Sequence, residues 1–520
     1  MNVEINTVTG RLGRPQAAGP RVFGLLGRDP SAAARLVRIE LRRNPMPWIL
    51  PLIAALFWFD SYRASVGAAP LYGLRTYWNM GEGHTINDFG PFVAGVAAWM
   101  GSRDGRRGLG DLVTAASRPR WTAQLATWAA TAIWAVAAYL AFVGVMFAWY
   151  ARQGVGGTPP WWWVAVGATA VIAFSAAGFA IGAFWPSRFA AAAAAFAAFL
   201  ALVASFQVGF KHTSGWALIL PTNFNGSFDG NAQADAGIFY PWLPDLPIAR
   251  IMFLAGIAVV ALSLTGLPAR AGSPRLRGAV ALFTAAGLAL AGTAVALAGS
   301  ALVAAEGVVI PALHDAANDA PVAYRPVCAG AAGVPVCLNP AYGRWLPDVT
   351  ADLAPVLAEV AGLPGAPTRA VQVAASYPSN ADGPPLILSL GGRPAVLSMA
   401  FGQLNMPGPC GFCAGPVSAG EFAGQVRYLF ARAFAGAGLG PGSQVQQAVQ
   451  AALLLDAGMP FAAQAAATQN IPAAPPGQAS AAVDAAASRL AALPAAARRG
   501  WLAAHLAALR SGGLTLDQLP

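Results

Sequence analysis

GPFVAGVAAWMGSRDGRRGLGDLVTAASRPRW, residues 90–121, places a charged segment between two apolar ones. The chain continues beyond it with a long run that carries almost no charge. Loops rich in arginine stay on the cytoplasmic side of a membrane. We therefore expect residues 102–121 to form an inner loop between two membrane-spanning helices. Its charged residues are Arg103, Asp104, Arg106, Arg107, Asp111, Arg118 and Arg120.

The composition also indicates a membrane protein. Of the 520 residues, 56% are hydrophobic and only 10% are charged, whereas soluble domains carry about 25% charged residues. The net charge of +10 resides in short loops between apolar runs, not on one continuous basic face, which argues against nucleic acid as a partner. The length leaves room for a second domain beside a membrane bundle.

Seven apolar stretches approach the roughly 20 residues that a spanning helix needs. The second is the weakest, because its dense apolar part, Phe89–Met100, is short. If the second stretch crosses the membrane, the basic loops all fall on one side, together with the N-terminus. The expected spans are 46–62, 84–101, 122–149, 161–185, 189–210, 247–268 and 278–304.

This topology divides the chain into three parts. Residues 1–30 contain no apolar core of signal-peptide length, and we expect a cytoplasmic tail there. Residues 31–304 are expected to form an all-α, multi-pass bundle in the plasma membrane. Residues 305–520 are expected to form an extracytoplasmic α+β domain, because an odd number of spans carries them to the outer side.

Before the first expected span, residues 31–44 alternate basic with apolar side chains. Ser31 can cap a helix there and Pro45 can end it. We expect a short amphipathic helix on the inner membrane surface, in contact with lipid. A simple basic anchor is the alternative. The arginines of this segment are Arg35, Arg38, Arg42 and Arg43.

Few ionisable residues fall inside the expected spans. Asp60, His84, Asp88 and Arg250 all lie near span ends, where we expect them to face the membrane interface. Transporters coupled to protons or sodium usually place carboxylates near the middle of the membrane. The pattern therefore argues against that class of transporter.

The amphipathic segment and the inner loop together resemble the permease subunits of ABC-2 type transporters, particularly the long actinobacterial ones. In that family the loop after the second span carries an Arg-rich stretch, an acidic helical segment and a Pro-Arg/Lys pair. Residues 103–107, 109–116 and 118–121 match these three features. The resemblance covers roughly residues 31–268. The family core has six spans, so a seventh span is a departure from it.

The resemblance implies that loop 102–121 is a coupling helix that docks into a separate ATPase subunit. It also implies a dimer of permease chains, either homodimer or heterodimer, that works as an exporter. Two alternatives stay open from the residues themselves. The arginines can serve only to orient the loop, and the chain can be a membrane-anchored sensor or scaffold that transports nothing.

No motif in the sequence indicates an enzyme. Lys211 is the only lysine, and no Gly-Lys-Ser/Thr phosphate-binding loop surrounds it, so ATP would be hydrolysed by a partner chain. The chain has neither HExxH nor GxSxG. His314 and His505 have no metal-ligand partners near them in sequence, and we expect both to be structural. We therefore assign no catalytic residue, metal or cofactor to this chain.

All four cysteines follow residue 305, in agreement with an oxidising location for that half. Two strand-like runs around a Gly/Ala turn favour a Cys328–Cys337 disulfide, and Cys410–Cys413 forms a CxxC that we expect to be the second disulfide. A redox-active CxxC and a four-cysteine zinc site are the alternatives.

The α+β assignment of this half rests on its periodicity. Helices are expected at 346–363, 421–437, 443–458 and 479–510, strands at 368–375, 384–390 and 394–401, and a linker at 463–480.

Overall fold

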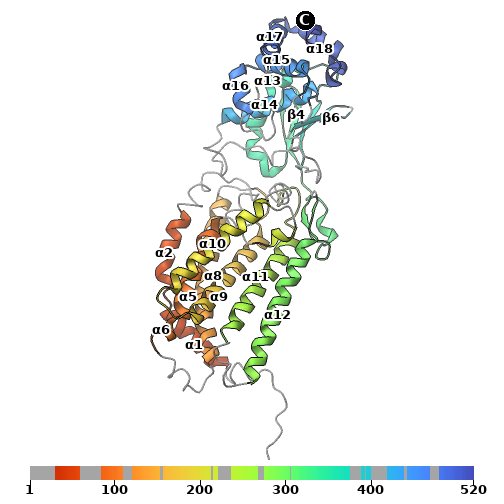
Figure 1. The fold of residues 1–520 in the computed structure, drawn as a ribbon. Helices are drawn as coiled ribbons and strands as arrows, with labels where there is room; N and C mark the ends of the chain where they lie inside the picture. The colour runs from red at the N-terminus through yellow and green to blue at the C-terminus, as the bar shows by residue number, and fades with distance from the viewer. Residues whose placement is uncertain are drawn as a thin grey trace, which may run out of the picture.

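The computed structural model has two parts, a long helical bundle and a smaller domain of helices and strands at one end of it (Figure 1). The residues that the structure describes are 30–58, 84–108, 120–152, 156–211, 215–220, 236–266, 274–304, 306–374, 388–392, 394–399, 419–437, 442–468 and 480–520.

Helices occupy the positions of all seven expected spans. Four of them are long and apolar enough to cross a membrane: α8, α9, α11 and α12. The remaining three contain shorter apolar segments, so their crossing stays a prediction. The seven helices are α2 (Met46–Phe57), α5 (His84–Gly101), α8 (Arg120–Arg152), α9 (Trp161–Phe184), α10 (Ala190–Lys211), α11 (Asp245–Leu264) and α12 (Pro274–Gly299).

The helix with the weakest apolar run, α5, is well buried in the bundle. Its Phe89, Val93 and Ala97 are fully buried, because α8, α9 and α10 surround it. The contact with α9 is close: a methyl group on Gly178 or Gly182 would overlap the backbone of α5. Small residues at such spacing let membrane helices approach backbone to backbone. The short apolar run of α5 is therefore shielded by neighbouring helices of the bundle.

Two short elements lie at the end of the bundle farthest from the C-terminal domain (Figure 1). They are α1 (Pro30–Arg43) and α6 (Arg103–Arg106), and α1 packs along α8. The predicted helix before the first span is confirmed. All four of its arginines are exposed, while Leu36, Val37 and Leu41 are half-buried. The half-buried residues pack against α8, and Ile39 is 47% exposed, so contact of this helix with lipid stays a prediction.

A short hairpin joins the bundle to the C-terminal domain. Its strands are β1 (Leu302–Ala304) and β2 (Gly307–Val309), which pair antiparallel across the expected boundary at 304/305. Val308 and Ile310 lie in the same apolar cluster as residues of α9, α11 and α12. The first residues after the last helix therefore belong to the core of the bundle.

The C-terminal domain is α+β, as expected. Its sheet runs in the order β3-β4-β5-β7-β6, with a parallel centre and antiparallel hairpins at both edges. The strands are β3 (Val327–Ala331), β4 (Val334–Leu338), β5 (Arg369–Gln372), β6 (Leu388–Gly391) and β7 (Val396–Met399). The helices are α13 (Leu346–Val360), α14 (Ala419–Ala435), α15 (Gln444–Asp456), α16 (Phe461–Thr468), α17 (Ala481–Ala492) and α18 (Ala495–Arg510).

Apolar spacing explains how this domain closes. In α13, Val349, Leu353 and Val356 recur every three or four residues and are buried, which is the pattern of a helix with one face on a core. In α14, three phenylalanines complete the same core cluster. One expectation is corrected: α16 occupies the start of the linker expected at 463–480, because Phe461 and Ala467 pack into this cluster.

The hairpin disulfide is also confirmed. Cys328 and Cys337 face each other in the register of β3 and β4 and are joined through their sulfurs. Their Cα atoms are 4.1 Å apart. Cys410 and Cys413 lie outside the described residues, so their pairing stays a prediction.

Candidate functional site

A bidentate ion pair joins α1 and α6, the two elements at the end of the bundle farthest from the C-terminal domain. Arg103, the first residue of α6, donates from Nη1 and Nη2 to the two carboxylate oxygens of Glu40 on α1, at 2.8 and 2.9 Å. Both side chains are largely shielded from solvent. The hydrogen bond with Glu40 raises the pKa of Arg103 although burial lowers it. The amphipathic helix and the inner loop are thus held together.

Arg106 contacts the end of α5 and forms no ion pair among the described residues. Its guanidinium lies over the Trp99 ring, 3.4 Å from the ring centre. Its Nε donates to Ser102 Oγ and its Nη2 to the Trp99 carbonyl, both at 3.0 Å. Burial, and the charge of Arg107, lower the pKa of Arg106. The Arg106 side chain therefore packs on the last turn of α5, whereas the side chain of Arg107 is exposed to solvent.

The other residues of the expected coupling loop are placed only in part. Asp104 lies on α6 with a carboxylate oxygen 3.5 Å from Arg103 Nε. Asp111 and Arg118 lie outside the described residues, and Arg120 is described only as the first residue of α8. A helix at 109–116 therefore stays a prediction.

Asn44, which the sequence did not single out, fixes the joint between α1 and α2. Its Nδ2 donates to Thr131 Oγ1 on α8 at 2.8 Å, and its Oδ1 accepts from the Met46 backbone N–H at 2.9 Å. Trp134, also on α8, donates to the Leu41 carbonyl at 3.0 Å. A polar residue just before Pro45 is a recognisable sign of a helix start, but nothing in its sequence context identifies Thr131 as the partner.

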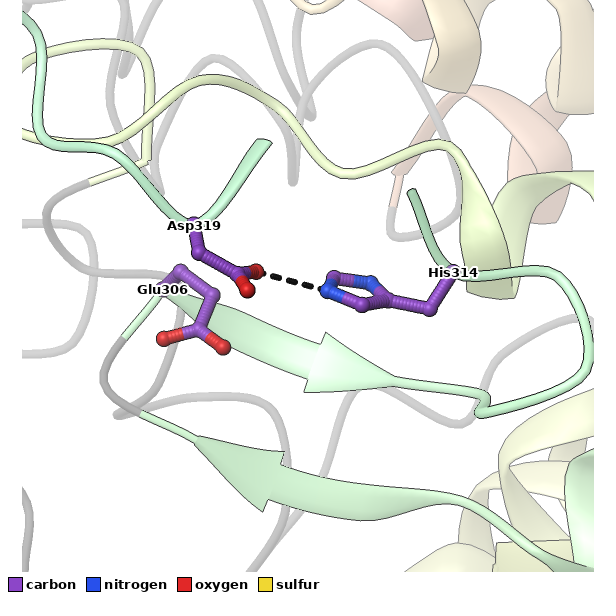
Figure 2. A group of neighbouring side chains, drawn as sticks. All are labelled: Glu306, His314 and Asp319. Atoms are coloured by element: carbon purple, nitrogen blue, oxygen red, sulfur yellow. Dashed lines mark hydrogen bonds and ion pairs between the residues drawn. The ribbon is translucent and has the colours of Figure 1, made fainter. Parts of the chain in front are cut away.

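A second polar cluster lies at the opposite end of the bundle, next to the β1–β2 hairpin. Asp245, in the first turn of α11, is completely buried, and its Oδ2 accepts from the Ile310 N–H at 2.9 Å. The same oxygen lies 3.0 Å from Nδ1 of His314. The other ring nitrogen of His314, Nε2, lies 2.6 Å from Asp319 Oδ1 (Figure 2). Glu306 completes the group, with potential ligand atoms within 4.8 Å of those of His314 and Asp319.

The expectation that His314 is isolated, with no metal-ligand partner near it in sequence, is therefore wrong. One partner is five residues away, and the other is on a helix 69 residues earlier. Burial lowers the pKa of His314, but the hydrogen bonds with Asp319 and Asp245 outweigh burial and raise it. Asp319 could have been found from its proximity in sequence. Asp245 could not, because only the packing of the hairpin on α11 brings it close.

The expectation for Arg250 is also corrected. Arg250 lies near the start of α11, but its side chain is fully buried by protein and does not face the membrane interface. Its Nε donates to the Leu218 carbonyl of η4 (Gly215–Ile219), and its guanidinium lies 5.1 Å from the centre of the Trp163 ring. The cause is η4, which packs against this end of α11. Asp60 and the side chains of His84 and Asp88 are outside the described residues.

Two charged residues are buried at this end of the bundle, although neither lies near the middle of an expected span. Asp245 and Arg250 lie in the first two turns of α11, and both are fully buried. The electrostatic cost of such burial is high unless charges are compensated. The low number of charges in the sequence therefore underestimates how much charge the folded bundle encloses.

Comparison with known proteins adds no relative. No family model matches the chain, and no curated protein or solved structure is significantly similar to it.

Proposed function

We propose that this chain is the membrane-spanning permease subunit of an ABC transporter of the ABC-2 type, working as an exporter. A separate ATPase subunit would bind the inner end of the bundle at residues 102–121 and hydrolyse ATP. The observation that carries the proposal is the bidentate pair of Glu40 and Arg103. It joins the two elements that a coupling subunit would have to move together.

The attachments of α1 and α6 would pass a movement caused by an ATPase subunit on to the helices of the bundle. α6 follows directly from α5, the buried helix that packs closely on α9. α1 is attached to α8 through the hydrogen bonds of Asn44 and Trp134. A displacement of the α1–α6 unit would therefore act on α5 and α8 at once. Rigid elements with a common attachment are what carry coupling between distant sites.

The exposed charges at this end are available to a soluble partner and to lipid. Arg107 is exposed and is not used to close α5. The exposed arginines of α1 suit anionic lipid headgroups. Charges at the rim of an interface contribute mainly to partner choice and association rate. Arg107 is therefore the described residue best placed to recognise an ATPase subunit, and a second permease chain would complete the assembly as a homodimer or heterodimer.

The test is co-purification from native membranes in mild detergent. The tagged chain is expected to recover a protein with a Walker-type ATP-binding motif, identified by mass spectrometry. The R107E variant is expected to lose most of this protein, at least tenfold. R152E is the matched control, because Arg152 is an exposed arginine at the opposite end of α8. Recovery of no ATPase, or equal recovery with R107E at equal membrane content, would contradict the proposal.

A sensor or scaffold without transport is the second candidate. Its support is the C-terminal domain, whose strands and helices form an apolar core of their own, which Ile238 and Phe239 from the segment before α11 join. Such a domain can bind a ligand or partner while the bundle serves only as an anchor. The same co-purification separates the two functions, because a scaffold requires no ATPase at its inner end.

A further inference from the structure

We propose that Glu306, His314 and Asp319 bind a divalent transition-metal ion, with Zn²⁺ as the best match. The site lies between the β1–β2 hairpin and the start of α11, at the end of the bundle next to the C-terminal domain (Figures 1 and 2). This proposal is independent of the transport function.

The donor atoms fit such an ion. The three residues offer one imidazole nitrogen and two carboxylates. Imidazole favours zinc and its neighbours, whereas magnesium and calcium prefer oxygen ligands alone. Ligands of a tetrahedral zinc site, about 2.1 Å from the ion, lie about 3.4 Å from one another. The donor atoms of the three residues lie within 4.8 Å of one another, and the shortest pair, His314 and Asp319 at 2.6 Å, would have to separate slightly around an ion.

Asp245 orients the histidine for metal binding. Its Oδ2 is a carboxylate oxygen and can only accept, so Nδ1 of His314, at 3.0 Å, must carry a proton and donate. In a neutral ring, Nε2 then presents its lone pair to Asp319 and Glu306. A buried carboxylate behind a ligating histidine is the arrangement that fixes the ring in many zinc sites.

The charge balance at the site favours a dication. Three carboxylates surround one imidazole, and no arginine among the described residues forms an ion pair with any of them. Asp245 is fully buried, and within the described residues its Oδ1 has no hydrogen-bond partner. His314 Nε2 and Asp319 Oδ1, 2.6 Å apart, share a proton in a hydrogen bond, and a metal ion bound to both atoms would replace that proton. A proton is the competing occupant of that position.

A bound ion would tie the connection between the two parts of the molecule to the bundle. Glu306 and Asp319 frame the segment that leaves the last helix and leads to the C-terminal domain. Asp245 links this segment to α11 through Ile310 and His314. Metal binding is therefore expected to slow amide exchange in residues 306–319.

The experiment is a titration of the purified full-length chain with Zn²⁺, using a tag without histidine. Calorimetry is expected to show one saturable site, and metal analysis after desalting about one zinc per chain. E306Q and D319N should each weaken binding at least tenfold. D245N should weaken it about 10- to 100-fold, as removal of such supporting carboxylates does. The matched control is D315N, because Asp315 caps η6 (Ala316–Asn318) close to the site without belonging to it.

A second version of the chain distinguishes the proposed site from other residues that could bind zinc. The sequence contains only four histidines, but Cys410 and Cys413 could bind zinc themselves. The titration is therefore repeated in a C410S/C413S chain, in which binding is expected to persist. Absence of saturable binding, loss of binding in the C410S/C413S chain, or unchanged binding in D319N and E306Q would overturn the proposal in favour of a proton between His314 and Asp319.

Discussion

At the scale of single residues, the Glu40–Arg103 pair connects positions 63 residues apart. E40Q or R103Q should each lower the free energy of unfolding by about 1 kcal/mol, because a half-buried bidentate pair is lost. The charge swap E40R/R103E should recover part of the loss. Amide exchange in α1 and thermal unfolding in detergent measure both effects.

D104N is the control for the Glu40–Arg103 pair, since Asp104 only approaches Arg103 at 3.5 Å. Single variants as stable as the wild type, with α1 equally protected from exchange, would show that the pair does not hold α1 in place.

The raised pKa of Asp456 predicts how the stability of the C-terminal domain depends on pH. Burial raises its pKa from 3.8 to about 6, while Arg498, 3.0 Å away, lowers it and Glu359 raises it. The folded state therefore binds a proton more tightly than the unfolded state between these values. Stability should fall as pH rises through this window. D456N should gain on the wild type between pH 4.5 and 7, measured by unfolding midpoints.

The control for the pH experiment is D517N, because Asp517 is exposed near the C-terminus. A wild-type chain that gains stability relative to D456N as pH rises would mean that the Arg498 pair dominates over burial.

At the scale of elements, α5 and α9 meet through glycines. Gly178 and Gly182 sit one turn apart against the carbonyls of Ala94 and Ala98, where a Cβ would overlap. G178A and G182A should each cost about 1–3 kcal/mol, as overpacking does. G144A on α8 should be neutral or slightly stabilising, because no atom lies near its Cβ and alanine favours helix. Thermal unfolding in detergent compares them, and G182A as stable as G144A would refute close backbone packing.

Element positions could largely be predicted from the sequence, because long apolar runs and basic loops mark helices directly. The helix before Pro45, the hairpin around Cys328 and the strands of the C-terminal sheet follow from periodicity and turn residues. The burial of α5 could not be predicted, because it results from neighbours distant in sequence. The position of α16 could not be predicted either, because its alanine-rich sequence resembles a linker.

The candidate sites could be predicted only where partners are close in sequence. Arg103 was expected to bear charge at the inner end, but its partner Glu40 lies on another helix. His314 was expected to be isolated, although Asp245 and Asp319 both contact it. Composition and spacing reveal residue types, whereas pairing across the bundle depends on how helices pack.

In the whole molecule, the two ends of the helical bundle carry different elements. α1 and α6 lie at one end, and the C-terminal domain lies at the other (Figure 1). α8, with 33 residues, is about 50 Å long, more than the roughly 30 Å of a bilayer core. Loop 102–121 precedes α8 and Arg152 ends this helix, so we expect these two points to lie on opposite sides of the membrane.

The most direct test of the proposed membrane subunit is therefore cysteine labelling in intact cells. In a C410S/C413S background, R107C and R152C are exposed to a membrane-impermeant maleimide, while the disulfide protects Cys328 and Cys337. We predict that R152C is labelled in intact cells and that R107C is labelled only after permeabilisation. Labelling of R107C in intact cells, with R152C protected, would place α6 outside and contradict an ATPase-coupled inner end.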